Sequence, residues 1–250
     1  MLEAIGITVN FGGINALTDV TLDVGAGEAV GLVGPNGAGK TTLFNSLLGL
    51  VRPTCGRVVF DGVDLAGLPV YRRARLGIGR TFQRVELFAE MTVREHLLVA
   101  ERARRGDGGL LKDLLNRGRP RPEEIERADA ILELVGIDAV ADQPVEALTL
   151  GQSRLVELGR ALIRDPKLLL LDEPSSGLDV VETNALGNVL LRVQRERGIA
   201  ILLVEHDLDL VRQVVSRLYV LDFGRVIAAG PCDEVLRDER VINAYVGVTP

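Results

Sequence analysis

The chain has 250 residues, of which 47% are hydrophobic and 26% charged, and its formal net charge is −6. This length and hydrophobicity suffice for the core of one large α/β domain or two small ones. The negative charge argues against a nucleic-acid-binding protein that relies on bulk charge. No stretch approaches the roughly 18 consecutive apolar residues of a membrane-spanning helix, and the N-terminus does not resemble a signal peptide, so we expect a cytoplasmic protein. Cys55 and Cys232 stand in no spacing typical of a zinc site or a disulfide framework, so we expect ordinary thiols.

Short apolar runs predict β-strands toward both ends of the chain, over residues 2–9, 20–24, 28–33, 56–61, 168–171, 199–204 and 218–221. Apolar residues at helical spacing predict helices over residues 43–50, 93–104, 123–135, 152–163, 180–197 and 208–215. Pro122 and Gly136 stand where the helix 123–135 should start and stop. The order of strand 28–33, helix 43–50 and strand 56–61 predicts a βαβ unit. The helical pattern from residue 91 to residue 163 predicts a helical insert in an α/β core.

A glycine-rich segment, Gly-Pro-Asn-Gly-Ala-Gly-Lys-Thr-Thr, follows an apolar strand and precedes a helix, the context that makes a phosphate-binding loop credible. Its glycines let consecutive backbone N–H groups turn toward one centre, and the helix N-terminus adds partial positive charge. We expect Lys40 to reach the β- and γ-phosphates and Thr41 to ligate Mg²⁺. The alternative, a glycine-rich turn without function, is rare for this motif in this context. The candidate ATP-binding residues of the loop are Gly34, Pro35, Asn36, Gly37, Ala38, Gly39, Lys40, Thr41 and Thr42.

Two adjacent carboxylates, Asp172 and Glu173, follow the apolar run Leu168 to Leu171. Side chains alternate along a strand, so the two can serve different tasks. We expect Asp172 to hold Mg²⁺ through a water. We expect Glu173 to accept a proton from the attacking water as the general base or to polarise that water. The carboxyl end of such a strand lies beside the phosphate loop in open α/β sheets. The alternative is that the two carboxylates only cap a core strand and have no catalytic role. A phosphate loop in the same chain makes this alternative less favoured.

Beyond these two motifs, the chain resembles the ATPase subunits of ABC transporters over essentially its whole length. Residues Leu148 to Gln152 stand at the place of the family's signature motif, just before a helix that leads to the strand at Leu168. Four further residues match family positions in the right order: Gln83 the Q-loop, Asp179 the D-loop, His206 the switch histidine that contacts the γ-phosphate, and Phe11 the aromatic residue that stacks on adenine. The alternative for Phe11, which precedes two glycines, is a residue that fills the core. The resemblance implies ATP and Mg²⁺ as cofactors, with catalytic roles for Lys40, Glu173 and His206 and metal-binding roles for Thr41, Gln83 and Asp172.

The resemblance also implies the fold, an α/β P-loop NTPase core of the ABC ATPase type. Its mixed sheet has an N-terminal antiparallel part, and an α-helical subdomain is inserted into the core. We expect residues 1–250 to form a single nucleotide-binding domain. The ATPase core comprises residues 1–88 and 166–250, and the helical subdomain with the signature motif comprises residues 89–165.

One departure from the family pattern falls in the signature motif, whose usual form is Leu-Ser-Gly-Gly-Gln. This chain has Thr149 and Leu150 at the second and third places. Thr149 keeps a hydroxyl for the γ-phosphate, and Gly151 keeps a backbone that permits close approach. Leu150 adds bulk, and we expect activity to survive it.

In the family, two ATPase subunits sandwich two ATP molecules, each held by the phosphate loop of one chain and the signature motif of the other. We therefore expect Thr149, Leu150, Gly151 and Gln152 to act on the nucleotide of a partner chain. The partner is a second copy or a related ABC ATPase. Transmembrane permease subunits and, indirectly, an extracytoplasmic substrate-binding protein complete the assembly, at the cytoplasmic face of the membrane and without nucleic acid.

The stretch from Gly77 to Ala100 and the C-terminal segment around Tyr245 resemble the longer ATPase of branched-chain amino acid importers. Alternatives are an ATPase for another load (amides, urea or lipopolysaccharide), a non-transport ABC ATPase of translation or DNA repair, or a regulatory module that closes on ATP without hydrolysis. Basic residues between 102 and 121 would touch anionic lipid headgroups or, the favoured alternative, form a solvated loop. They are Arg102, Arg104, Arg105, Lys112, Arg117, Arg119 and Arg121.

Overall fold

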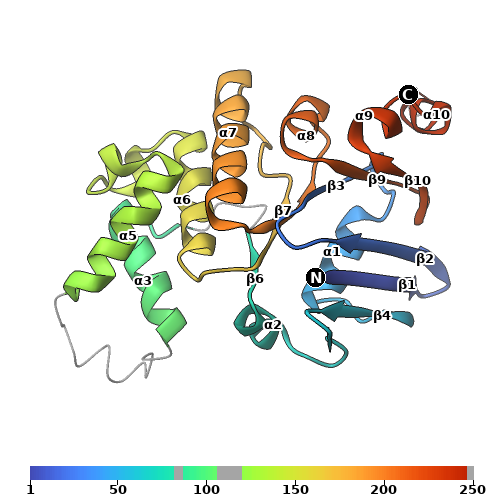
Figure 1. Cartoon of the computed structure of the whole chain (residues 1–250), viewed down its shortest axis with the longest axis horizontal. Helices are drawn as coiled ribbons and strands as arrows, with labels where there is room; N and C mark the ends of the chain where they lie inside the picture. Colours follow the sequence, from blue (N-terminus) through green and yellow to red (C-terminus); the bar gives the residue numbers. More distant parts are fainter. Residues whose placement is uncertain (82–86, 106–119, 247–250) are drawn as a thin grey trace.

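Two β-sheets and the helices around them make up the part of the chain that the computed structural model describes, which is residues 1–81, 87–105 and 120–246. The antiparallel strands lie at one end of the molecule and a group of helices at the other (Figure 1). None of the helices in these residues is long and apolar enough to cross a membrane.

The first sheet is antiparallel, with the order β2-β1-β4-β5. Its strands are β1 (Leu2–Phe11), β2 (Ile14–Val24), β4 (Cys55–Phe60) and β5 (Val63–Asp64). Along β1 and β2 buried and accessible residues alternate, as expected for a sheet with one face on the core and the other in water. Helix α1 (Lys40–Leu48) covers the buried face with Leu43, Phe44 and Leu47.

The second sheet is mixed, with the order β10-β9-β3-β8-β7-β6. Its strands are β3 (Ala29–Val33), β6 (Ile78–Arg80), β7 (Leu168–Asp172), β8 (Ala200–Val204), β9 (Arg217–Asp222) and β10 (Arg225–Pro231). All neighbours are parallel except β9 and β10. Strands β3 and β8 are buried at every position, which explains their solid apolar sequences.

The predicted βαβ unit is wrong. Strand β3 pairs with β8 and β9, whereas β4 pairs with β1 and β5 in the antiparallel sheet. The burial of the two strands gives the reason: β3 is buried on both faces, whereas β4 buries Val58 and Phe60 and leaves its first three residues exposed. A strand covered on one face suits an antiparallel sheet.

Three long helices pack against one another at the end of the molecule opposite β1 and β2 (Figure 1). They are α3 (Val93–Arg105), α5 (Pro122–Val135) and α6 (Leu150–Leu162), with the short turns η1 (Asp138–Val140) and η2 (Val145–Ala147) between the last two. Helix α5 begins at Pro122 and ends before Gly136, whose φ is 77°, as predicted. Side chains of Leu97, Ile131 and Leu158 fill the space between the helices.

The remaining helices are α2 (Val70–Leu76), α7 (Val180–Arg197), α8 (Leu208–Val214), α9 (Cys232–Val235) and α10 (Glu239–Val246). Elements β5, α2, β6, β10, α9 and α10 were not predicted from the sequence; most are too short to show a clear period. Helix α1 begins at Lys40, three residues before the predicted start, because Gly39, with a φ of 104°, ends the preceding loop.

Candidate active site

The glycine-rich loop joins β3 to α1 and turns sharply against its neighbours. Gly34 and Gly39 have φ values of 150° and 104°. A Cβ atom on Gly34 would lie 2.0 Å from the carbonyl oxygen of Leu221, and one on Gly39 would lie 2.7 Å from that of Ala16. Among the described residues, no side chain caps the N-terminus of α1, and its first turn holds no acidic residue. The loop therefore offers backbone N–H groups and the positive helix end to an anion.

Lys40, the first residue of α1, folds back over this loop. Its Nζ donates hydrogen bonds to the carbonyl oxygens of Gly34 (2.6 Å) and Pro35 (3.1 Å), and the residue is 7% exposed. Burial lowers the pKa of Lys40, while the charges of Glu173 and Asp172 act in the opposite direction. The first residue of α1 thus places its ammonium group near both the phosphate loop and the carboxylates of Asp172 and Glu173. The next residue, Thr41, is exposed.

Asp172 is the last residue of β7, and Glu173 follows it with a φ of 47°. The backbone N–H of Glu173 still donates to the carbonyl oxygen of Val204 on β8 (2.8 Å), so the turn begins while the chain is held to the sheet. Burial, Glu173 and then Glu205 raise the pKa of Asp172 to about 6, against the opposing effect of Lys40. A partly buried site with this excess of carboxylate charge suits a divalent cation such as Mg²⁺, which prefers oxygen ligands.

Glu205 is a functional candidate that the sequence analysis missed. Its side chain is fully buried, and Oε1 accepts hydrogen bonds from the N–H (2.9 Å) and the hydroxyl (2.7 Å) of Ser175. Its Oε2 accepts from the N–H of His206 (3.0 Å). Glu205 therefore joins the loop that follows Glu173 to the loop that carries His206, whose own side chain is 60% exposed. The available signal was an acidic residue directly after the apolar strand β8.

The predicted signature segment lies at the N-terminus of α6. Thr149 caps this helix: its Oγ1 accepts from the N–H of Gln152 (3.2 Å), and Gln152 Oε1 accepts from the N–H of Thr149 (3.0 Å). Leu150 lies over Gly177, where an added Cβ would be 3.0 Å from a Leu150 methyl carbon. Helices α6 and α1 lie on opposite sides of α7 (Figure 1), so one chain does not bring its signature segment to its own phosphate loop.

The other predicted residues have different outcomes. Asp179 caps α7 through a hydrogen bond from the N–H of Glu182 to its Oδ1 (2.8 Å). Phe11 is 52% exposed at the tip of the β1–β2 hairpin, so it is not a core residue. The same hairpin reaches the phosphate loop at Ala16, next to Gly39. Gln83 lies outside the described residues.

Sequence and structural comparisons agree on the family. Residues 17–176 match the family model described as "ABC transporter". The chain is 40% identical over 250 residues to LivG of Salmonella typhimurium, a high-affinity branched-chain amino acid transport ATP-binding protein, covering 99% of this chain and 98% of the relative. The chain belongs to the ABC transporter family. It is also 36% identical to LptB of Haemophilus influenzae, a lipopolysaccharide export system ATP-binding protein, over 99% of this chain and 97% of the relative.

Solved ABC cassettes share the fold. An ATP-binding cassette of an ABC transporter in its ADP conformation superposes with a TM-score of 0.87 and 35% identity, covering 99% of this chain and 98% of that one. A dimeric bacterial ABC transporter cassette superposes with a TM-score of 0.75 and 26% identity, covering 93% of this chain and 99% of that one. The architecture is thus that of a P-loop ABC ATPase, and the chain is an ATP-hydrolysing subunit of a type that acts as a dimer with transmembrane partners.

Proposed function

We propose that the chain hydrolyses MgATP as one half of an ATPase dimer and energises the uptake of branched-chain amino acids. The observation that carries the ATPase role is the placement of the buried Lys40 near the partly buried carboxylates Asp172 and Glu173, next to an N-terminus of α1 that no side chain of the described residues caps. The load is inferred from the 40% identity to LivG over nearly the whole chain. The subunit would act at the cytoplasmic face of the membrane, bound to permease subunits and, through them, coupled to an extracytoplasmic binding protein.

Residues of the phosphate loop, from Gly34 to Thr42, would hold the ATP phosphates through backbone N–H groups, with Lys40 as the counter-charge. Thr41, Asp172 and Gln83 would hold Mg²⁺. When bound, Mg²⁺ would neutralise phosphate charge and stabilise the leaving group. Phe11, exposed on the hairpin that touches this loop, would stack on adenine.

Glu173 is the proposed general base. The left-handed backbone at this residue turns its side chain away from the strand that ends in Asp172, so a base and a metal ligand come from adjacent positions. Glu173 would accept the proton of the attacking water. His206, largely exposed and anchored through its N–H to Glu205, would contact the γ-phosphate.

The second half of each site would come from a partner subunit, because α6 and α1 lie apart within one chain. Thr149, Leu150, Gly151 and Gln152 of the partner, with Asp179 beside them, would cover the γ-phosphate. Closure would exclude water from the site. The partner is a second copy of this chain or a related ABC ATPase.

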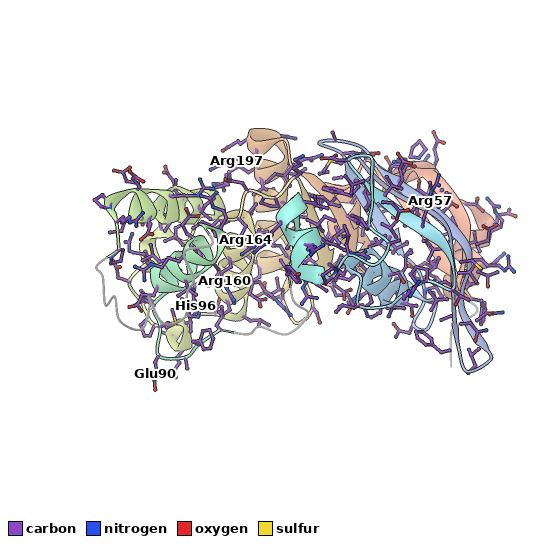
Figure 2. All side chains as sticks on the ribbon, turned by 90° about the horizontal axis from the view of Figure 1, so that it is seen from below. Arg57, Glu90, His96, Arg160, Arg164 and Arg197 are labelled. Carbon is purple, nitrogen blue, oxygen red and sulfur yellow. The ribbon has the colours of Figure 1, made fainter. Side chains whose placement is uncertain are left out.

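A groove of about 290 Å³ between α2, β6, α3 and α6 is the proposed seat of the permease. Apolar side chains such as Val70, Phe88 and Val99 line it together with Arg160 and Arg164, which lie near His96 in Figure 2. It contains residues of the proposed ATPase core (1–88 and 166–250) and of the proposed helical subdomain (89–165). A cytoplasmic permease segment with apolar and acidic residues would fit it.

Phosphate release from MgATP by the purified chain and its Glu173→Gln variant tests the ATPase role. We expect turnover in the parent, and in the variant ATP binding with turnover at least about 100-fold slower, because general-base catalysis contributes about that much or more. Size-exclusion chromatography should give an ATP-dependent dimer of the variant. A Glu173→Gln variant with the parent's rate contradicts the role of Glu173. ATP binding without hydrolysis in the parent supports a need for a partner ATPase or a regulatory role, with Leu150 the first residue to replace.

The load is tested on the complex isolated from its own cells through a tag on this chain and reconstituted in liposomes. Leucine, isoleucine or valine is added together with the extracytoplasmic binding protein of the same transporter. We expect these amino acids to raise the ATPase rate. Because the 36% identity to LptB favours lipopolysaccharide as the second candidate, the same liposomes should be tested with lipopolysaccharide. Stimulation by lipopolysaccharide and not by the amino acids overturns the proposed load but leaves the ATPase role intact.

A further inference from the structure

At the start of α6, the backbone N–H groups of Thr149, Gly151 and Gln152 donate hydrogen bonds to side chains of the same chain. Thr149 and Gln152 form a reciprocal capping box. The N–H of Gly151 donates instead to a more distant residue, with its hydrogen bond to Oε1 of Glu182 on α7 measuring 3.3 Å. A carboxylate therefore already lies on an amide of the signature segment.

Glu182 is shared between the signature segment and the cap of α7. Its second carboxylate oxygen, Oε2, accepts from the N–H of Asp179 (3.4 Å), while its own N–H donates to Asp179 Oδ1 (2.8 Å). In an ordinary capping box the glutamate serves only its own N-cap residue. Here one half-buried side chain connects Asp179 to Gly151.

The signature segment and the loop before α7 are in close contact around the hydrogen bond between the Gly151 N–H and Glu182. A Cβ added to Gly151 would lie 2.8 Å from Glu182 Oε1, so the carboxylate reaches the amide only because this residue is glycine. Leu150 lies over Gly177, and Arg154 donates to the carbonyl oxygen of Ser176 (3.3 Å). The segment is thus held against residues 176–182 of its own chain.

We propose that Glu182 acts as an internal substitute for the γ-phosphate: it occupies the Gly151 amide in the separated subunit and is displaced by the partner's ATP when the dimer closes. This inference rests on the proposed function of the signature segment. A single N–H cannot serve two anions at full strength, and a carboxylate beside a phosphate is repelled. The Gly151–Glu182 hydrogen bond consequently opposes closure, and its release changes the environment of Asp179 in the same step.

The test measures the ATP concentration at which half of the protein is dimeric, by analytical ultracentrifugation, with Glu173→Gln as the parent so that ATP persists. Adding Glu182→Gln keeps the shape of the side chain and replaces a charged acceptor with a neutral one, whose hydrogen bond is roughly half as strong. We expect the midpoint to fall several-fold. Glu196→Gln, at the exposed far end of α7, removes the same charge and should leave the midpoint unchanged. An unchanged or higher midpoint in Glu182→Gln overturns the proposal.

A second measurement tests the contact in the subunit without ATP. In protein labelled with ¹⁵N-glycine, the Gly151 amide resonance, identified by its loss in Gly151→Ala, should differ between the Glu173→Gln parent and its Glu182→Gln derivative. With ATP bound in the dimer, the two resonances should coincide. Equal Gly151 resonances in the two proteins without ATP overturn the proposal, whatever the ATP dependence of dimerisation. Failure of the Glu173→Gln parent to dimerise with ATP counts against the proposed function, whereas a normal parent with an unaffected Glu182→Gln derivative overturns only the role of Glu182.

Discussion

At the scale of single residues, Lys40 shows how little space the phosphate loop leaves. Its ammonium group donates to two carbonyl oxygens of the loop within 3.1 Å, and the residue is 7% exposed. An ammonium group is compact, whereas a guanidinium group is planar and wider. The loop is therefore shaped for lysine as well as for positive charge.

Replacing Lys40 by arginine should weaken ATP binding by about 2 kcal/mol, roughly thirtyfold in Kd, because a misplaced cation loses the charged hydrogen bonds that the loop arranges. Isothermal titration with ATP and Mg²⁺ measures this effect. We expect the Lys40→Ala variant to bind ATP at least as weakly as the Lys40→Arg variant. A Lys40→Arg variant with the parent's affinity would show that charge alone suffices.

At the scale of elements, Arg217 ties the two sheets together. From β9 it donates to both carboxylate oxygens of Glu28, just before β3, and to both of Asp23 on β2, at 2.8–3.0 Å. These hydrogen bonds to Arg217 are the main cause that holds the pKa values of Asp23 and Glu28 below their usual range. A lowered pKa in the folded state stabilises the fold above pH about 4, and this contribution disappears as the pH falls through the lowered values.

Arg217→Met should lower the free energy of unfolding by about 1–2 kcal/mol at pH 7, a range that allows for solvent screening of the partly exposed Asp23. The loss should shrink at pH 3, because both carboxylates are mostly protonated in the unfolded chain at that pH and the folded state gains less from their interaction with Arg217. Urea unfolding at the two pH values measures it. Arg195→Met, at an exposed position of α7, is the control and should change little at either pH. A loss that is equal at pH 7 and pH 3 would contradict the ionic origin.

At the scale of the whole molecule, two paired strands link the candidate nucleotide site to the proposed permease groove. Strand β6 pairs with β7, which ends in Asp172, and β6 also lines the groove. A movement of the helical group relative to the sheet would therefore change both places. This connection is the physical basis for coupling hydrolysis to transport in the proposed function.

Arg164→Glu should reverse the charge at the groove, weaken binding to the permease about tenfold or more and reduce coupled transport, while the detached subunit keeps its ATPase rate. Co-purification and transport in liposomes measure the first two effects, and phosphate release measures the third. Arg57→Glu is the matched control, since Arg57 lies at the opposite end of the molecule in Figure 2. Normal assembly of the Arg164→Glu variant would exclude the groove as the seat of the permease.

Much of the fold was predictable from local patterns. Strands β3, β7 and β8 are solid apolar runs, and the ends of α5 follow from Pro122 and Gly136. Elements such as β6, with three residues, exist only because a neighbouring strand offers hydrogen bonds. The assignment of β4 to the antiparallel sheet was missed for a related reason, since strand pairing depends on residues far away in the chain.

The sequence by itself determined the family, and it predicted the phosphate loop, the acidic pair and the signature segment, because glycine spacing and charged residues at strand ends are local features. Only the tertiary structure decided that Glu205 joins the loops of Glu173 and His206, and that Glu182 reaches Gly151. These contacts span about 30 residues, and nothing in the spacing of a glutamate tells which distant amide its carboxylate will meet. Packing brings those groups together, so packing alone reveals their connection.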